Sequence, residues 1–327
     1  MNKKNLIIKK TLFEAFQNHQ KNNLTVAKNL YKKILKISPD HFESILLLGT
    51  LSIQTKNFNL AIKLLNRAVQ LQPNHANANY NLGLAFTELK EFKKAMPYCQ
   101  KTIEIEPDHV EAYNNRGNTL KQQGKLEEAV QSFNKAIQLK PDYIEAYYNR
   151  GIAFRQQGEL ENAVKSFKKA INLKPDFEQA HYNHGHVLKA QGKLKKAIES
   201  YDKAIQLRPD FEQAHYNRGN ILQKQIKLEE AVESYDKAIE LKPDYVEPYN
   251  NRGNTLRNLG RLDESIMSFE QALALKPNFS EVHSNLLLAS HYHPKLSSEA
   301  IFKKHIAWGK SNVVQNKINE SYKNDKN

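Results

Sequence analysis

The chain has 327 residues, of which 40% are hydrophobic and 26% are charged, and its formal net charge is +14. The single cysteine, Cys99, excludes an intramolecular disulfide framework and a cysteine-based zinc cluster. No apolar run approaches the roughly 20 residues that span a bilayer. The apolar stretch near the start is too short for a signal peptide. We therefore expect a cytoplasmic protein that has no membrane partner.

The positive charge is concentrated at the two ends of the sequence. Residues 1–36 carry nine lysines and one acid, a net charge of +8, and residues 303–327 carry +4, which leaves +2 for the long middle. A nucleic-acid-binding groove would carry its positive charge along the working surface. The distribution favours lysines that keep the terminal segments solvated, and we expect no nucleic-acid partner. The alternative, that the chain binds nucleic acid, predicts an affinity that falls steeply as the salt concentration rises.

In chain order, a basic extension (1–7) is followed by a 34-residue period that runs to residue 279. Proline closes each period, from Pro39 to Pro277, and glycine recurs in phase from Gly49 to Gly253. An alanine lies between them in seven copies, and Ser265 replaces it in the last. The position four residues after this alanine is aromatic or apolar. The period defines eight repeats: 8–41, 42–75, 76–109, 110–143, 144–177, 178–211, 212–245 and 246–279.

This order of Gly, Ala, aromatic and closing Pro resembles the tetratricopeptide repeat (TPR) family. The resemblance implies an all-α fold, a right-handed superhelical solenoid of helix–turn–helix repeats. It also implies that the first helix of each repeat lines a concave groove. We expect Gly and Ala where the two helices of a repeat approach closely, and the aromatic residue between one repeat and the next. Cys99 occupies an aromatic position, which predicts a small buried hydrophobe.

Candidate binding residues lie on the first helices, at positions that the resemblance places in the groove. An asparagine stands two residues before the in-phase glycine in six copies and before Leu287 in a seventh, and its amide could bond both N–H and C=O groups of an extended peptide. Asparagine is also common here in TPR proteins generally, so a purely structural role stays open. The in-phase residues are Asn81, Asn115, Asn149, Asn183, Asn217, Asn251 and Asn285, with Tyr148, Tyr182 and Tyr216 beside them and Lys121, Arg155, Lys189 and Arg257 one turn further. They predict a polar, mildly basic channel for a protein or peptide segment with acidic character.

The residue between the asparagine and the glycine is an arginine in four copies. Buried arginine is costly unless it is paired. We expect these arginine stems to cover apolar surface while the guanidinium groups reach a helix edge or a carboxylate. The residues are Arg116, Arg150, Arg218 and Arg252.

Nothing in the sequence predicts an enzyme within this chain. The histidines at 181, 184, 186 and 215 lack a carboxylate that would complete a metal-ligand pattern, so we expect no metal. His181 and His215 stand where other copies have tyrosine, which indicates packing residues. The sequence has no phosphate-binding glycine loop and no nucleophile elbow. We expect no catalytic residue and no cofactor.

The segment after the repeats is predicted to form capping and connector helices (280–310) and then a flexible tail (311–327). Its pattern from Ser284 to Gly309 resembles the junction that follows the TPR array in bacterial SPINDLY-type O-linked N-acetylglucosamine transferases. The resemblance implies a substrate-recognition part of such a system, with the catalytic region absent here and a separate catalytic chain docking near Ile301–Trp308. The alternative is a fragment or member of a UDP-GlcNAc-dependent protein glycosyltransferase.

Overall fold

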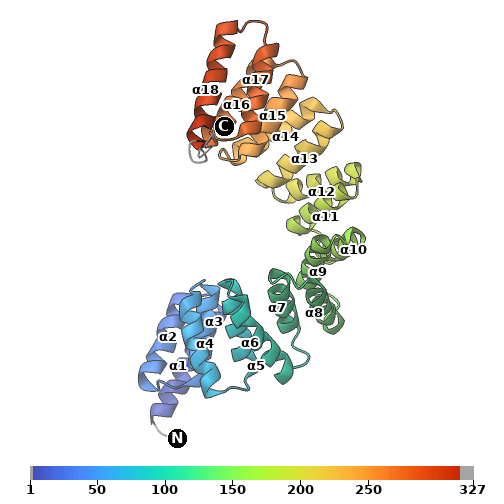
Figure 1. The fold of residues 1–327 in the computed structure, drawn as a ribbon. Helices are drawn as coiled ribbons and strands as arrows, with labels where there is room; N and C mark the ends of the chain where they lie inside the picture. Colours follow the sequence, from blue (N-terminus) through green and yellow to red (C-terminus); the bar gives the residue numbers. More distant parts are fainter. Residues whose placement is uncertain (1–2, 317–327) are drawn as a thin grey trace, which may run out of the picture. The chain divides into compact units, whose positions relative to one another are not determined.

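The computed structural model describes residues 3–316, and all regular structure in that range is α-helical. Eighteen helices alternate as first and second members of helix–turn–helix pairs, which confirms the all-α repeat fold (Figure 1). The first helices are α1 (Lys3–Gln20), α3 (Phe42–Gln54), α5 (Ala76–Glu88), α7 (Val110–Gln122), α9 (Ile144–Gln157), α11 (Glu178–Ala190), α13 (Glu212–Lys224), α15 (Val246–Asn258) and α17 (Ser280–Tyr292). The second helices are α2 (Leu24–Ile37), α4 (Phe58–Leu71), α6 (Phe92–Ile105), α8 (Leu126–Leu139), α10 (Leu160–Leu173), α12 (Leu194–Leu207), α14 (Leu228–Leu241), α16 (Leu262–Leu275) and α18 (Ser298–Asn316).

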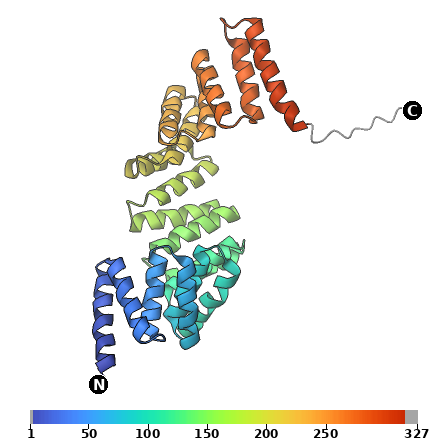
Figure 2. The ribbon, with the colours of Figure 1, turned by 90° about the vertical axis from the view of Figure 1, so that its left-hand side faces the viewer.

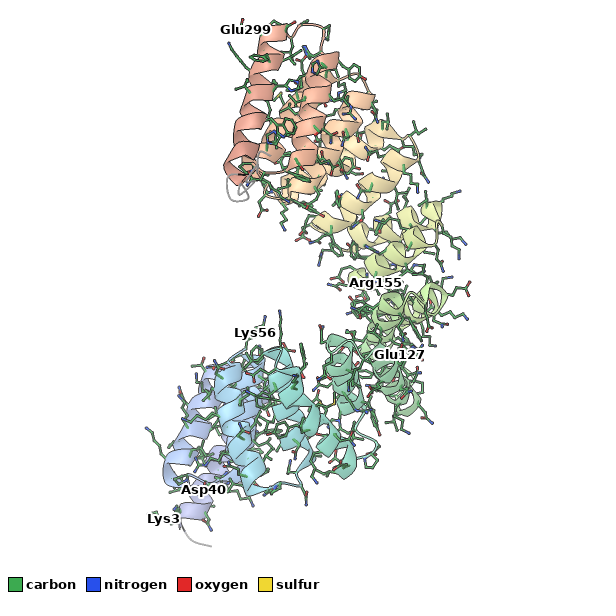
Figure 3. All side chains as sticks on the ribbon, viewed as in Figure 1. Lys3, Asp40, Lys56, Glu127, Arg155 and Glu299 are labelled. Carbon is green, nitrogen blue, oxygen red and sulfur yellow. The ribbon has the colours of Figure 1, made fainter. Side chains whose placement is uncertain are left out.

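The chain forms two compact units, one within Met1–Lys174 and the other within Pro175–Asn327. Inside each unit, the second helix of a repeat packs against its own first helix and against the first helix of the next repeat. First helices of consecutive repeats also contact one another, as α5 does with α7 and α13 does with α15. Asp40 and Lys56 mark the opposite ends of α3 (Figure 3). The turns within repeats and the loops between repeats therefore form opposite edges of the array.

The in-phase glycine makes room for the aromatic residue of its own repeat. A methyl group added at Gly117 would lie 2.5 Å from the Phe133 ring, and one at Gly151 would lie 2.7 Å from the Phe167 ring. Phe133 is fully buried and clusters with Ala153 of the next repeat. The aromatic side chain therefore fills the space between repeats, as predicted, and it also requires the glycine opposite. Cys99 is fully buried in the equivalent place, as expected.

The turn between the two helices of a repeat needs one residue with positive φ. Glycine supplies it in four repeats, for example Gly124 at φ +77°. Asn22, Lys56, Lys90 and Ile226 adopt the same conformation elsewhere, with φ between 55° and 63°. A side chain with a Cβ is disfavoured in this region, most of all a β-branched one. The turns at Lys56, Lys90 and Ile226 therefore carry backbone strain that the glycine-containing turns avoid, whereas asparagine adopts this conformation more readily.

The two ends of the helical array differ from the boundaries that the period suggested. Helix α1 begins at Lys3, because Ile8 and Thr11 pack on the core and the preceding residues continue the same helix. Helix α18 extends to Asn316, into the segment predicted as a flexible tail, and residues 317–327 lie outside the described range. Helices α17 and α18 lie side by side in two perpendicular views (Figures 1 and 2). Within the described residues, no helix combines the length and apolarity needed to cross a bilayer.

Candidate peptide-binding face on the first helices

The in-phase asparagines link consecutive first helices. In five of the seven, the side-chain amide nitrogen donates a hydrogen bond to a side chain on the preceding first helix, 31 or 35 residues back. Asn149 donates to Asn114 Oδ1 at 3.1 Å, and Asn251 donates to Asn220 Oδ1 at 2.8 Å. The other three are Asn81, Asn217 and Asn285. These asparagines therefore contribute to the contact between repeats, a role that in-phase spacing alone did not distinguish from ligand binding.

The seven asparagines differ in exposure. Asn115, Asn183 and Asn217 are buried, whereas Asn81, Asn149, Asn251 and Asn285 retain partly accessible side chains. The Asn115 amide nitrogen lies 3.6 Å from the Cys99 sulfur. Cys99 is smaller than the aromatic residue at the same position in other repeats, so it leaves space for this approach. The part of the series that could contact a peptide directly is therefore the half-buried part.

The tyrosines beside the asparagines pack against rings of neighbouring elements. The Tyr182 ring lies 4.7 Å from the Phe211 ring, and the Tyr216 ring lies 5.1 Å from the Tyr245 ring, measured between centroids. Tyr148 packs edge-on against Phe167. The Tyr182 hydroxyl also accepts a hydrogen bond from Asn217 at 3.1 Å. Each of the three tyrosine rings is half-buried. It therefore packs in the contact between neighbouring helices and leaves part of the ring accessible to solvent.

The cationic positions are half-buried on the same helices. Burial lowers the pKa of Lys121 to about 8, and the nearby Arg155 guanidinium contributes to the same shift. Burial also lowers the pKa of Lys189, whose ammonium donates to Asn217 Oδ1 at 3.0 Å. No carboxylate within the described range is close enough to Lys121 for an ion pair, and its ammonium donates instead to Asn118 Oδ1 at 3.1 Å. Figure 3 labels Arg155, which projects from the last turn of α9.

The structure distributes the predicted residues between the two units. Lys121, Arg155 and Tyr148 lie in the first unit with Asn81, Asn115 and Asn149. The second unit holds Asn183, Asn217, Asn251, Asn285, Tyr182, Tyr216, Lys189 and Arg257. Within the first unit Lys121 lies close enough to the Arg155 guanidinium of the next repeat for that charge to contribute to the lowering of its pKa.

A cavity of about 610 Å³ lies at the start of the same face, and the sequence pattern did not reveal it. Phe16, Leu47 and Thr50 line it, together with His19 and Gln54, which share a 2.8 Å hydrogen bond. Leu47 stands two residues before Gly49, which is the position of the asparagines in later repeats. Carrying the repeat alignment back into the first two copies would have identified these residues as an apolar counterpart of the asparagine series.

All four arginines reach a serine hydroxyl, and two of them, Arg218 and Arg252, also reach a carboxylate as expected. Each guanidinium donates to the serine sixteen residues later, on the second helix of its own repeat. Arg218 also donates to Asp202, on the second helix of the preceding repeat. The arginine series is therefore structural, and it joins each first helix to its neighbours.

The histidines at tyrosine positions form local hydrogen bonds. The Nε2 atoms of His181 and His215 lie 3.0 Å from the carbonyl oxygens of Pro175 and Pro209, and the Tyr147 hydroxyl donates to the Pro141 carbonyl in the same way. The two histidines therefore contact the same carbonyl position that the tyrosine hydroxyl contacts in another repeat. Among the residues that the structure describes, no three His, Cys, Asp or Glu side chains form a group that could hold a metal ion.

Four family models, described as "TPR repeat" or "Tetratricopeptide repeat", match the chain. The matched residues are 19–85, 76–109, 98–131, 117–158, 151–192, 185–225, 227–260 and 246–279. None of these matches extends beyond residue 279, so the resemblance of the Ser284–Gly309 segment to a SPINDLY-type junction stays a prediction. No curated protein matches this chain.

Solved structures similar to this chain are repeat proteins of low sequence identity. YrrB, described as a TPR protein with an unusual peptide-binding site, is 23% identical over 56% of this chain and 95% of its own, with a TM-score of 0.50. The C-terminal part of a TPR repeat-containing protein from Cytophaga hutchinsonii is 16% identical over 74% of this chain and 99% of its own, with a TM-score of 0.61. The APC/C hetero-tetramer Cut9–Hcn1 matches 81% of this chain at 16% identity and a TM-score of 0.58, and the match spans 52% of that chain. At these identities the likeness concerns the fold. With the family matches covering nearly all of residues 19–279, the chain belongs to the tetratricopeptide repeat family.

Proposed function

We propose that this chain is a protein-binding scaffold that holds an extended, acidic segment of a partner protein against the first helices. The observation that carries the proposal is the half-buried cation pair Lys121 and Arg155, which lies in register with partly accessible amides on neighbouring helices. Lys121 has no carboxylate partner among the described residues, so a ligand carboxylate would offset the cost of burying its charge beside Arg155. The peptide-binding site of YrrB, a repeat protein of similar fold, is consistent with a peptide ligand here.

Spacing also supports an extended ligand. First helices of neighbouring repeats pack roughly 8–10 Å apart, and an extended chain advances ~3.3 Å per residue. One amide per repeat would therefore meet about every third residue of the ligand. Asn81 and Asn149 remain partly accessible within the first unit and can offer their side-chain oxygens as acceptors. Such contacts would hold a backbone without reading most of its side chains.

The experiment uses labelled twelve-residue peptides that are acidic, neutral or basic but otherwise matched in composition. We expect the full chain to bind the acidic peptide best in a fluorescence anisotropy titration. The double substitution Lys121→Gln and Arg155→Gln should weaken this binding about tenfold or more, since charge-assisted hydrogen bonds contribute roughly 1.5–3 kcal/mol. Lys168→Gln with Lys169→Gln, on the exposed side of α10, is the matched control. Equal binding of all three peptides would contradict the proposal.

The triple change of Asn149, Asn183 and Asn217 to Ala is the test of the amide series, and it needs a stability control. Asn217 bonds Tyr182, Lys189 and a backbone carbonyl, so its loss weakens the repeat contact as well. Asn149→Ala alone removes one half-buried amide and is the cleaner variant. Unchanged affinity in a folded Asn149→Ala chain would assign this residue to structure only.

More specifically, we propose that the scaffold is the substrate-recognition part of a sugar-transfer system. A separate catalytic chain would then dock near Ile301–Trp308. Two apolar side chains of α18 support a docking role, because Phe302 is 62% exposed and Ile306 is 44% exposed. The alternative, that the chain itself is part of a UDP-GlcNAc-dependent glycosyltransferase, predicts sugar-nucleotide binding. Isothermal titration with UDP-GlcNAc separates the two, because binding by this chain alone would favour the alternative.

A further inference from the structure

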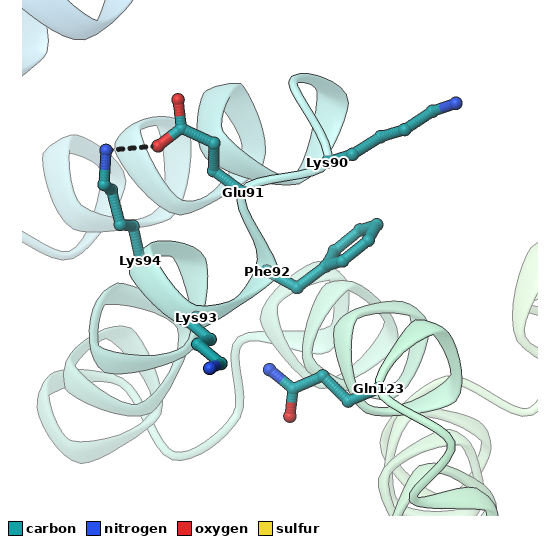
Figure 4. Close-up of a pocket in the computed structure, with 6 residues that line it drawn as sticks. All are labelled: Lys90, Glu91, Phe92, Lys93, Lys94 and Gln123. Atoms are coloured by element: carbon teal, nitrogen blue, oxygen red, sulfur yellow. Dashed lines mark ion pairs between the residues drawn. The ribbon is translucent and has the colours of Figure 1, made fainter.

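A second cavity lies at the edge of the array formed by the turns within repeats. Its volume is about 400 Å³, and Lys90, Glu91, Phe92, Lys93, Lys94 and Gln123 line it. The first five come from the α5–α6 turn and the start of α6, and Gln123 caps the end of α7 in the next repeat. Figure 4 shows the Lys93 and Gln123 side chains reaching toward each other beside the Phe92 ring. None of these residues belongs to the first-helix positions discussed above.

The charges around this cavity are unbalanced. Lys94 pairs with Glu91, and its ammonium also lies 5.8 Å from the centre of the Phe86 ring. Lys90 and Lys93 are exposed, and neither has an ion-pair partner among the described residues. Phe92 is half-buried and, with the lysine stems, forms an apolar wall. The cavity therefore combines an aromatic surface with two uncompensated cations.

The backbone at Lys90 is strained, and this is a second feature of the cavity besides its unbalanced charge. Lys90 has φ +61° at the turn position where Gly124, Gly158, Gly192 and Gly260 occur in other repeats. Glycine would adopt this conformation without a steric penalty, so the lysine carries a cost of about 1 kcal/mol that glycine would remove. Strained residues can mark a place where a side chain has a task, although Asn22, Lys56 and Ile226 adopt the same conformation in other repeats. In this turn the strained residue, Lys90, also supplies one of the two cations that lack an ion-pair partner among the described residues.

We propose that this cavity binds a short segment of a partner protein in which a bulky apolar side chain is flanked by carboxylates. The apolar side chain would pack on Phe92, and the carboxylates would pair with Lys90 and Lys93. A volume of about 400 Å³ lies within the range of ligand sites, roughly 300–1,000 Å³. A small metabolite would need several fixed polar groups for orientation. The polar atoms here are flexible ammonium groups and one amide, which suit the acidic surface of a protein segment better.

The probe is a fluorescein-labelled peptide, Ser-Glu-Glu-Trp-Glu-Glu-Ser, titrated with the full chain. Two matched peptides replace Trp with Ala or all Glu with Lys. We expect the first peptide to bind at least fivefold more tightly than either of the others. Lys93→Gln and Phe92→Leu should each weaken it about threefold or more. Leucine occupies the Phe92 position in repeats four to eight, so this change is compatible with the fold.

Lys90→Gly separates binding from folding. It removes one cation and the strain together, so we expect a higher melting temperature and weaker peptide binding in the same variant. A merely structural role for Lys90 would leave the affinity unchanged. Lys195→Gln, at the position of Lys93 in the sixth repeat, is the control and should bind the peptide as the wild type does.

Two outcomes would overturn the inference. One is no detectable preference of the wild type for the acidic tryptophan peptide. The other is a preference that Lys90→Gly, Lys93→Gln and Phe92→Leu leave intact but Lys121→Gln with Arg155→Gln removes. That second pattern would place the peptide on the first-helix face and would support the proposed function instead.

Discussion

Arg218 Nε donates to Asp202 Oδ1 at 2.6 Å, and this ion pair joins the first helix of one repeat to the second helix of the repeat before it. The same guanidinium donates from Nη1 to the Ser234 hydroxyl at 2.7 Å. Arg218 is about three-quarters buried, whereas Asp202 is half exposed. The contact therefore includes one well-covered hydrogen bond and one ion pair that solvent partly screens.

Arg218→Ala should lower the free energy of unfolding by about 1–2 kcal/mol, because a charged hydrogen bond and stem packing are lost but the exposed acid stays hydrated. Urea denaturation is the suitable measurement, since guanidinium chloride would screen the ion pair. Lys203→Ala, on the exposed side of α12, is the control. An unchanged urea midpoint for Arg218→Ala would show that the arginine series contributes nothing to the repeat contact.

Lys121→Gln should stabilise the fold at pH 7, raising the melting temperature by about 1–3 °C. The pKa of Lys121 is about 8 in the folded chain, against about 10.4 in an unfolded one. Between these values the unfolded chain binds more protons, so the wild type gains stability as pH rises from 8 to about 10.4. The difference between variant and wild type should therefore shrink across that window. Melting curves at pH 7, 9 and 10 check the sign, and a constant difference would contradict it.

Gly117→Ala should destabilise the chain more than Gly124→Ala does. The first change places a methyl group 2.5 Å from the Phe133 ring, and repacking a tight core costs about 1–3 kcal/mol. The second adds a methyl group at φ +77° where no atom lies within 4 Å, so only the strain of about 1 kcal/mol remains. Combining Gly117→Ala with Phe133→Leu should recover part of the loss. The order of the two urea midpoints decides the prediction.

Ile226→Gly should stabilise the chain by up to about 1 kcal/mol, since glycine avoids the steric cost of this conformation. This isoleucine is 80% exposed and has φ +63°, a conformation that β-branched residues rarely adopt. The relief of strain is partly offset by the greater flexibility of glycine in the unfolded chain. Thermal melting of the variant beside Lys224→Ala, an exposed neighbour on α13, measures the effect. A lower melting temperature would indicate that Ile226 makes a contact worth more than its strain.

The period alone predicted the elements and most of the core, because each helix pair repeats one packing solution. Gly117 opposite Phe133 and Cys99 in an aromatic position follow from spacing and size. What spacing could not determine is which atoms a polar side chain meets. The contact of Asn149 with a ligand stays a prediction, and its amide nitrogen bonds Asn114, since the neighbouring helix lies within reach of the same side chain.

The cavity beside Phe92 was the other feature that the repeat pattern could not predict. The cavity beside Phe92 depends on how the α5–α6 turn lies against Gln123 of the following repeat. That relation involves residues that vary from repeat to repeat, so no periodic signal marks it. The extent of α1 and α18 was also missed, because a terminal helix has no neighbouring copy whose length could be compared.

The backward direction of the asparagine bonds makes the array unequal at its two ends. The in-phase amide nitrogens donate to the earlier helix, as Asn285 does to Asn250, although Asn217 also accepts a hydrogen bond from Lys189 on the earlier helix. Deleting the first repeat of the second unit would leave the Asn217 amide without its Tyr182 acceptor, and this donor would then need water as a partner. Deleting the last repeat of the first unit would remove the Asn149 donor and leave its Asn114 acceptor, which tolerates exposure more readily. Shortened chains of equal length should therefore differ in solubility according to which end was removed.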